Sequence, residues 1–219
     1  MTRTVATWNV NSLRVRLPHL TAWLAANPVD AIALQETKLP DADFPAADLQ
    51  ALGWNSAFSG QRTYNGVAIL SRDPATDVVA GIPGFDDEQR RVLAASLGSL
   101  RVIDVYVPNG QTVGSDKFAY KLRWFDALRD YVAAELARHP HLVVLGDFNV
   151  APEDRDVHDP KAWEGSVHVS PPERAALQAL LGTGLADCFR LFEQPEKSYS
   201  WWDYRMMAFR RNAGLRIDL

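Results

Sequence analysis

Hydrophobic positions along the chain follow two periods, one typical of strands and one typical of helices. Apolar runs predict strands at 3–10, 29–36, 54–59, 65–71, 91–97 and 100–107, and a further strand from His141 into Asp147. A 3.6-residue period predicts helices at about 14–26, 115–138 and 172–181. The strands between 54 and 107 follow one another too closely for helical crossovers, so part of the sheet structure is expected to be antiparallel.

This order of elements runs without a linker or a repeat and predicts an α/β fold in a single domain over residues 1–219. Many strands with few helices favour two mixed β-sheets face to face, with helices outside. Residues 150–172 are rich in Pro, Asp and Glu and are expected to form a long loop, a kind of segment that is usually functional. Ser170-Pro171-Pro172-Glu173 predicts the capped start of the last helix.

Charge and composition narrow the classes of partner and compartment. The formal net charge is −4 and the pI is about 5.7, so any contact with nucleic acid must come from a local basic patch. The single Cys188 excludes an intramolecular disulfide and a multi-cysteine zinc site, which fits a reducing compartment. Without an apolar stretch of membrane-spanning length or a signal-peptide pattern, the chain is expected to be cytoplasmic with no membrane partner.

Candidate chemistry begins at Gly146-Asp147-Phe148-Asn149, which ends the apolar run 141–145. Asp147 and Asn149 are two residues apart, so strand alternation predicts that both side chains point to the same face. A carboxylate and a carboxamide at a strand end suit a hard cation and a phosphate. The alternative interpretation is an Asx-rich turn that forms for purely local reasons.

Other predicted strands also end in polar residues, namely Asn9, Glu36 and Tyr106, and Asn109 follows shortly after the last of these. The carboxyl ends of strands are where α/β proteins usually build their sites, so these residues are expected to converge. Taken singly, Glu36 could instead be a surface glutamate, and Tyr106 could instead be a half-buried strand residue without a role in a site.

Seven short motifs occur in one order and are together much more specific than any one alone. They are Thr7-Trp-Asn-Val-Asn-Ser-Leu-Arg14, Leu34-Gln-Glu-Thr-Lys38, Asn65-Gly-Val-Ala-Ile-Leu-Ser71, Tyr106-Val-Pro-Asn-Gly110, Leu145-Gly-Asp-Phe-Asn-Val150, Ser198-Tyr-Ser-Trp-Trp-Asp-Tyr204 and Leu215-Arg-Ile-Asp218. With them the chain closely resembles the exodeoxyribonuclease III family of abasic-site endonucleases, within the endonuclease/exonuclease/phosphatase superfamily.

The resemblance implies a four-layered α/β sandwich and a DNA repair nuclease that depends on Mg²⁺ or Mn²⁺. Such an enzyme hydrolyses phosphodiester bonds of double-stranded DNA at abasic sites and from 3′ ends, as in base excision repair. The resemblance also implies metal contacts from Asn9, Glu36, Asp147 and Asn149. Asp147 would orient or deprotonate the attacking water, while Asn149 and Tyr106 would act as catalytic hydrogen-bond donors to the phosphate or the departing oxygen.

The segment 198–218 is expected to contact DNA. Its arginines are Arg205, Arg210, Arg211 and Arg216, against only Asp203 and Asp218, and this local surplus could neutralise backbone phosphates. Trp201 and Trp202 should face opposite ways, and we expect Trp202 to meet the nucleic acid. Asn109 is expected to reach the DNA backbone.

Members of the family continue beyond the Arg-Ile-Asp strand to a terminal Asp-His pair. The histidine of that pair is oriented by the aspartate that matches Asp218. The resemblance therefore implies that Asp218 is a further catalytic residue. The sequence ends at Leu219. The domain is therefore expected to be incomplete at its carboxyl end and to lack its last strands. A catalytically impaired nucleic-acid-binding relic or fragment stays open as an alternative function. A phosphoesterase for small or lipid phosphates is a third, although the similar enzymes of that kind carry histidine where this chain has Tyr106.

Overall fold

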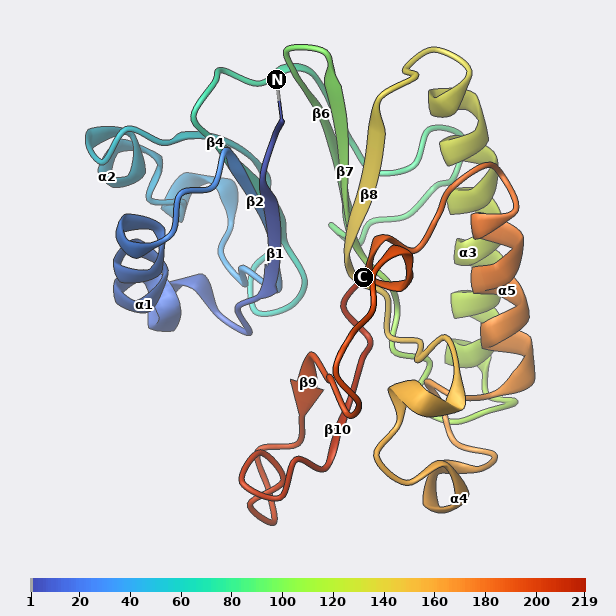
Figure 1. Cartoon of the computed structure of the whole chain (residues 1–219). Coiled ribbons are helices and arrows are strands. Elements are labelled where there is room, and N and C mark those ends of the chain that lie inside the picture. Colours follow the sequence, from blue (N-terminus) through green and yellow to red (C-terminus); the bar gives the residue numbers. More distant parts are fainter. Residues whose placement is uncertain (1) are drawn as a thin grey trace. The chain divides into compact units, whose positions relative to one another are not determined.

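The computed structural model describes residues 2–219 of the protein (Figure 1). Its internal contacts divide the chain into two compact units. The first unit contains the residues up to Tyr106 together with Arg138–Asp147, and the second contains Val107–Ala137 and Phe148–Leu219. The single domain expected for residues 1–219 stays a prediction.

The first unit contains a mixed sheet with the strand order β1-β2-β4-β3. Its strands are β1 (Val5–Asn9), β2 (Ala31–Gln35), β3 (Asn55–Ser59) and β4 (Val67–Ser71). β1 and β2 are parallel, and the other two pairs are antiparallel. Helices α1 (Leu13–Ala26) and α2 (Ala46–Ala51) and the 3₁₀ turn Asp41–Asp43 lie in the connections. Leu20 of α1 and Leu49 of α2 pack with Ile32 and Leu34, so both helices cover one face of this sheet.

A second mixed sheet in the same unit has the order β5-β6-β7-β8. Its strands are β5 (Thr76–Ala80), β6 (Val92–Leu97), β7 (Leu100–Tyr106) and β8 (Leu142–Asp147). β7 and β8 are parallel and the other pairs are antiparallel. Ala33 and Ile69 of the first sheet share one core cluster with Leu93 and Val102 of the second. The two sheets therefore pack face to face, as predicted.

The second unit contains two helices that contact each other, α3 (Asp116–Leu136) and α5 (Pro171–Leu181) (Figure 1). The predicted cap of α5 is present, because Ser170 accepts from the third helical residue while Glu173 accepts from the Ser170 backbone. The shorter elements are the 3₁₀ turns Asp154–Asp156 and Cys188–Leu191, helix α4 (Pro160–Trp163), and the paired strands β9 (Trp201–Trp202) and β10 (Gly214–Leu215).

The α/β class and the two mixed four-stranded sheets are confirmed, and so is antiparallel pairing between 54 and 107. Several short elements were not predicted, among them β5 and α2. β5 exposes most of its side chains at a sheet edge, and α2 has six residues, so neither has a clear apolar period. No helix within residues 2–219 combines the length and the apolar character that crossing a membrane requires.

Candidate active site

Asn9, the last residue of β1, lies between two carboxylates of the first unit. Its Nδ2 donates to Glu36 Oε1 and to Asp147 Oδ2, both at 2.9 Å. Its Oδ1 accepts from the backbone N–H of Asn11 at 3.0 Å. A flipped amide would aim its oxygen at both carboxylates, so these partners fix its orientation. The geometry thus favours Asn9 as a residue that orients Glu36 and Asp147, because its nitrogen faces both carboxylates and its oxygen is engaged by the backbone. The metal contact expected of Asn9 stays a prediction.

Glu36 comes directly after β2, where the chain leaves the strand conformation with a φ of 54°. The next residues are anchored, because the N–H of Lys38 donates to Asn65 O at 3.0 Å. Lys38 Nζ lies 2.8 Å from Glu36 Oε2. Burial acts to raise the pKa of Glu36, but hydrogen bonds from Lys38 and Asn9 and the charge of Lys38 outweigh it and lower that pKa. The carboxylate is therefore ionised at neutral pH.

Tyr106 ends β7 and pairs in register with Asp147 of β8. Its hydroxyl hydrogen-bonds to Glu36. Arg91 lies over the ring at 4.6 Å and donates to the Tyr106 carbonyl at 3.1 Å. Burial, and then the charges of Glu36 and Asp147, raise the pKa of Tyr106 above its usual value. The phenol therefore stays protonated and can donate a hydrogen bond without adding charge.

Gly146 explains how Asp147 comes to its place beside Tyr106. A Cβ at position 146 would lie 2.0 Å from the carbonyl oxygen of Val105, so a side chain there is excluded while β8 pairs closely with β7. β8 ends at Asp147, which is buried. Asn149 has a left-handed φ of 52°. The prediction that strand alternation reaches Asn149 is therefore wrong, because the chain leaves the strand conformation before that residue.

The donor set of the first unit suits a hard divalent cation. Glu36 and Asp147 offer carboxylate oxygens, and the Asn9 amide nitrogen donates a hydrogen bond to each of them. Across residues 2–219 there is no group of three or more His, Cys, Asp or Glu side chains of the kind that cages a metal. Mg²⁺ commonly takes one or two carboxylates and fills its other positions with water and phosphate oxygens, so these residues fit it.

In the second unit, Asn109 and Asn149 lie side by side. Asn109 Nδ2 lies 3.3 Å from Asn149 Oδ1, and Asn149 Nδ2 donates to Val107 O at 2.9 Å. His168 joins them: its Nδ1 lies 2.7 Å from Asn149 O and its Nε2 lies 3.4 Å from Asn109 Nδ2. Burial and the charge of Lys121 lower the pKa of His168 to about 4, so the ring is neutral at pH 7.

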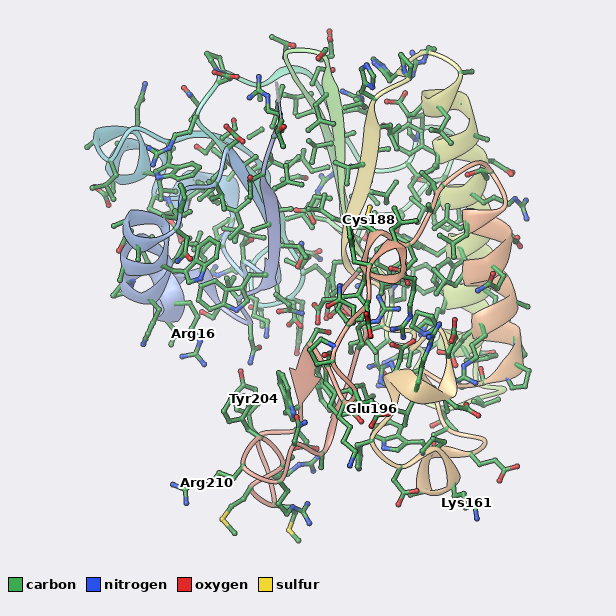
Figure 2. The ribbon with its side chains drawn as sticks, in the orientation of Figure 1. Arg16, Lys161, Cys188, Glu196, Tyr204 and Arg210 are labelled. Atoms are coloured by element: carbon green, nitrogen blue, oxygen red, sulfur yellow. The ribbon has the colours of Figure 1, made fainter. Side chains whose placement is uncertain are left out.

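The predicted DNA-contact segment forms a hairpin around β9 and β10. Trp202 donates from Nε1 to Asn212 at 3.1 Å and meets the Phe209 ring edge to face at 5.0 Å. Trp201 packs inward against an apolar cluster that includes Leu215, so the two tryptophans differ as expected. The hairpin loop exposes a set of large apolar and basic side chains, namely Tyr204, Arg205, Met206, Met207, Phe209, Arg210 and Arg211 (Figure 2).

Two residues near the carboxyl end behave differently from each other. Arg216 is buried and its guanidinium donates to Asp156 at 2.7 Å and to Asp187 at 2.6 Å. This placement contradicts the expectation that Arg216 binds DNA phosphates, because its charge is already paired away from solvent. Asp218 is half-buried, its N–H donates to Ser200 Oγ at 3.0 Å, and desolvation raises its pKa to about 6.

Comparison with known proteins identifies the family. The model of the endonuclease/exonuclease/phosphatase family matches residues 6–219. The chain is 35% identical to an exodeoxyribonuclease of Bacillus subtilis, over 96% of this chain and 84% of the relative. It is also similar to the solved AP endonuclease of Archaeoglobus fulgidus, with a TM-score of 0.95, 36% identity and coverage of 99% of this chain and 85% of that one. This chain belongs to the exodeoxyribonuclease III family.

A third similarity lies within the same family. A Neisseria 3′ phosphatase, solved with a product DNA hairpin, shares 50% identity and a TM-score of 0.97, covering 99% of this chain and 85% of that one. Membership makes the chain an enzyme, a nuclease of the exodeoxyribonuclease III and AP endonuclease type.

Three contacts were not predicted from the sequence, namely that of Lys38 with Glu36, that of Arg91 with Tyr106, and that of His168 with Asn109 and Asn149. Arg91 was only a weaker candidate for DNA contact, and His168 only one of two histidines that could in principle reach the site. Lys38 ends the motif Leu34-Gln-Glu-Thr-Lys38, and its spacing of two from Glu36 was the available signal. His168 lies in the segment 150–172, which was expected to form a long functional loop. The contact of Arg91 with Tyr106 carried no signal in the sequence, because it depends on the pairing of β6 with β7.

Proposed function

We propose that this exodeoxyribonuclease III-type nuclease hydrolyses phosphodiester bonds of double-stranded DNA, at abasic sites and at 3′ ends, with Mg²⁺ or Mn²⁺. The observation that carries the proposal is the arrangement around Asn9, whose amide holds Glu36 and Asp147 at 2.9 Å each while Tyr106 hydrogen-bonds to Glu36. A metal-binding carboxylate, a candidate base and a neutral phenolic donor thus meet within one unit.

Glu36 and Asp147 would hold the cation. A bound divalent cation polarises a phosphoryl oxygen and lowers the pKa of water. Tyr106 can donate to a phosphate or to the departing oxygen, and its raised pKa keeps the proton in place. Asp147 can accept the proton of the attacking water, and Asn9 keeps its carboxylate oriented for this.

The second unit would contribute contacts to the nucleic acid. Asn149 can donate to phosphate, and Asn109 can reach the backbone, since their side-chain amides already meet at 3.3 Å. The hairpin loop would supply phosphate contacts from Arg210 and Arg211 and an exposed apolar surface for bases. In Figure 2 the Arg210 side chain projects away from the ribbon. Arg205 is paired with Asp203 and would have to exchange that partner for a phosphate.

Cleavage assays can determine which kind of DNA substrate the chain prefers. The purified chain is offered four duplexes, carrying an abasic site, a 3′ phosphate, a recessed 3′ end or an undamaged blunt end, with Mg²⁺ and then with EDTA. Incision or 3′ processing that EDTA abolishes supports the proposal. DNA binding without cleavage of any duplex contradicts it and favours the noncatalytic relic instead.

Glu36→Gln and Asp147→Asn serve as site variants in the same assay, and we expect each to lose about 10²-fold or more in kcat. Glu193→Gln is the matched control, because that glutamate is exposed and lies outside the site. Turnover of a small soluble phosphodiester with no response to any DNA duplex would favour a phosphoesterase of the same superfamily.

A further inference from the structure

A polar layer lies directly behind the candidate active site, in the space between the two sheets of the first unit. Gln35 and Asp104 are both 0% exposed. Gln35 is the residue before Glu36, and Asp104 is two residues before Tyr106. Because alternate residues of a strand share a face, Asp104 and Tyr106 point from β7 toward the same inter-sheet space. Thr7 has the same relation to Asn9 on β1.

Hydrogen bonds join this layer across the sheets. Gln35 Nε2 donates to Asp104 Oδ1 at 2.7 Å and to Thr7 Oγ1 at 3.0 Å. The bond to Asp104 runs from β2 of one sheet to β7 of the other. Ala33 and Val102, which lie two residues earlier on the same faces of β2 and β7, belong to the apolar core. Buried polar side chains in such a place are costly unless they are hydrogen-bonded, and apolar residues would pack there equally well.

The candidate active site takes residues from both sheets, so its geometry depends on the distance between them. Asn9 and Glu36 come from the first sheet, whereas Tyr106 and Asp147 come from β7 and β8 and pair with each other in register. Apolar contacts are not directional and allow sheets to slide, but a hydrogen bond of 2.7 Å sets both distance and register. A shift of β7 relative to β2 would move Tyr106 and Asp147 together away from Glu36.

We propose that Gln35 and Asp104 are positioning residues, whose hydrogen bond across the two sheets aligns Tyr106 and Asp147 with Asn9 and Glu36. Neither residue touches the reacting atoms, and both act through their neighbours on β2 and β7. The inference rests on the proposed function, since it concerns the alignment of that same site.

The test replaces both partners by apolar residues of similar shape, Gln35→Met together with Asp104→Leu. Replacing a whole buried polar pair is often nearly neutral for stability, so the double variant is expected to fold. We expect kcat on the best DNA substrate to fall about tenfold with KM changed less than about twofold, and the dissociation constant for Mn²⁺ to rise about tenfold. Electron paramagnetic resonance of free Mn²⁺ measures the latter without any turnover.

Two further variants separate positioning from packing. Asp104→Asn retains an oxygen that accepts from Gln35, so kcat and Mn²⁺ affinity should stay within about threefold of wild type. Ile69→Val removes a methylene from the same inter-sheet core, so it should lower stability without changing kcat or the Mn²⁺ affinity. If kcat simply follows stability across all variants, the inference is overturned.

A folded double variant with wild-type kcat and wild-type Mn²⁺ affinity also overturns it. Should the double variant fail to fold, Asp104→Leu alone decides the matter, because it removes the bond across the sheets and leaves Gln35 its hydrogen bonds with Thr7. Unchanged Mn²⁺ affinity in that variant refutes the inference. A wild-type chain that cleaves no DNA contradicts the proposed function alone if the Mn²⁺ readings change as expected. A wild-type chain that neither cleaves DNA nor binds Mn²⁺ overturns both.

Discussion

Asn9 shows how a neutral side chain can bring two negative ones together. Glu36 and Asp147 would repel each other if they approached without a partner. The two hydrogens of one amide nitrogen give each carboxylate a donor at 2.9 Å, and Lys38 adds a charge on the far oxygen of Glu36. Glu36 can therefore stay ionised beside a second carboxylate in a mostly buried place, which is what a cation site needs.

Tyr106→Phe tests the phenol at the residue scale. We expect kcat to fall by about 10²-fold or more with little change in KM, because the hydroxyl would act on charge that develops during the reaction. Steady-state rates on the best DNA substrate give both constants, and circular dichroism checks the fold. Tyr64→Phe is the matched control, since that ring is 69% exposed. Equal rates for Tyr106→Phe and wild type would remove Tyr106 from the mechanism.

At this scale the sequence predicted the positions of four candidate residues, because each stands at or directly after the end of an apolar run that does form a strand, namely Asn9, Glu36, Tyr106 and Asp147. Their roles stay predictions. The directions of the side chains and their hydrogen-bond partners were harder to predict. Asn149 leaves the strand conformation, and Arg216 is paired with carboxylates from distant positions. Such pairings depend on tertiary contacts that spacing along the chain does not encode.

Elements of the second unit are tied together by a buried ion pair. Lys121 of α3 contacts Glu173 of α5, and its Nζ also donates to Asn149 O at 2.8 Å and to Asn109 O at 3.2 Å. Glu173 in turn accepts from the backbone of His168 at 3.0 Å. This pair therefore links two helices to the loops that carry the proposed phosphate contacts.

Lys121→Met should lower the free energy of unfolding by about 3–5 kcal/mol, because it leaves the Glu173 carboxylate buried without its counter-charge. Adding Glu173→Gln should recover part of that loss. Urea unfolding followed by circular dichroism measures both. Lys117→Met, at an exposed position of the same helix, is the control and should change stability little. An additive loss in the double variant would show that the pair carries no coupling.

The hairpin formed by β9 and β10 is the element expected to recognise DNA. Trp202→Ala should raise the dissociation constant for a DNA duplex by about tenfold and leave turnover of a small phosphodiester nearly unchanged. The reason is that Trp202 supports Phe209 and Asn212 within the exposed loop. Fluorescence anisotropy gives the affinity. Phe192→Ala, which removes an exposed ring outside the hairpin, is the control. Parallel losses on both substrates would refute this assignment.

The elements themselves were predictable where an apolar period was long. α3 and the strands of the inter-sheet core fall within a few residues of their predicted bounds. β5 escaped because its place at a sheet edge leaves most of its side chains in solvent. The β9–β10 hairpin escaped because two-residue strands carry no period at all.

For the whole molecule, His168 predicts how stability responds to acid. Its pKa is lowered to about 4 in the folded state, whereas an unfolded histidine titrates near 6.5. Between these values the unfolded chain binds the extra proton, so stability is full above pH 6.5 and falls as the pH drops toward 4, by about 3 kcal/mol in total. Asp218 acts in the opposite sense, because its raised pKa of about 6 makes its folded form bind the proton first.

Comparison with His168→Asn isolates the histidine, since the background groups titrate equally in both proteins. Urea unfolding at a series of pH values from 7 to 4 should show wild type losing more stability than the variant across this window. Identical pH profiles would mean that the ring is protonated as easily in the folded chain as in the unfolded one.

The first unit takes β8 from a stretch of sequence that follows α3, a helix of the other unit. While the chain is being synthesised, β7 therefore emerges long before its parallel partner and presents an unpaired edge. Asp147 is the last residue of that unit to leave the ribosome, so the nascent polypeptide acquires its second carboxylate at the moment when this sheet can close. Newly made chains are most prone to pair with one another in the interval before that closure.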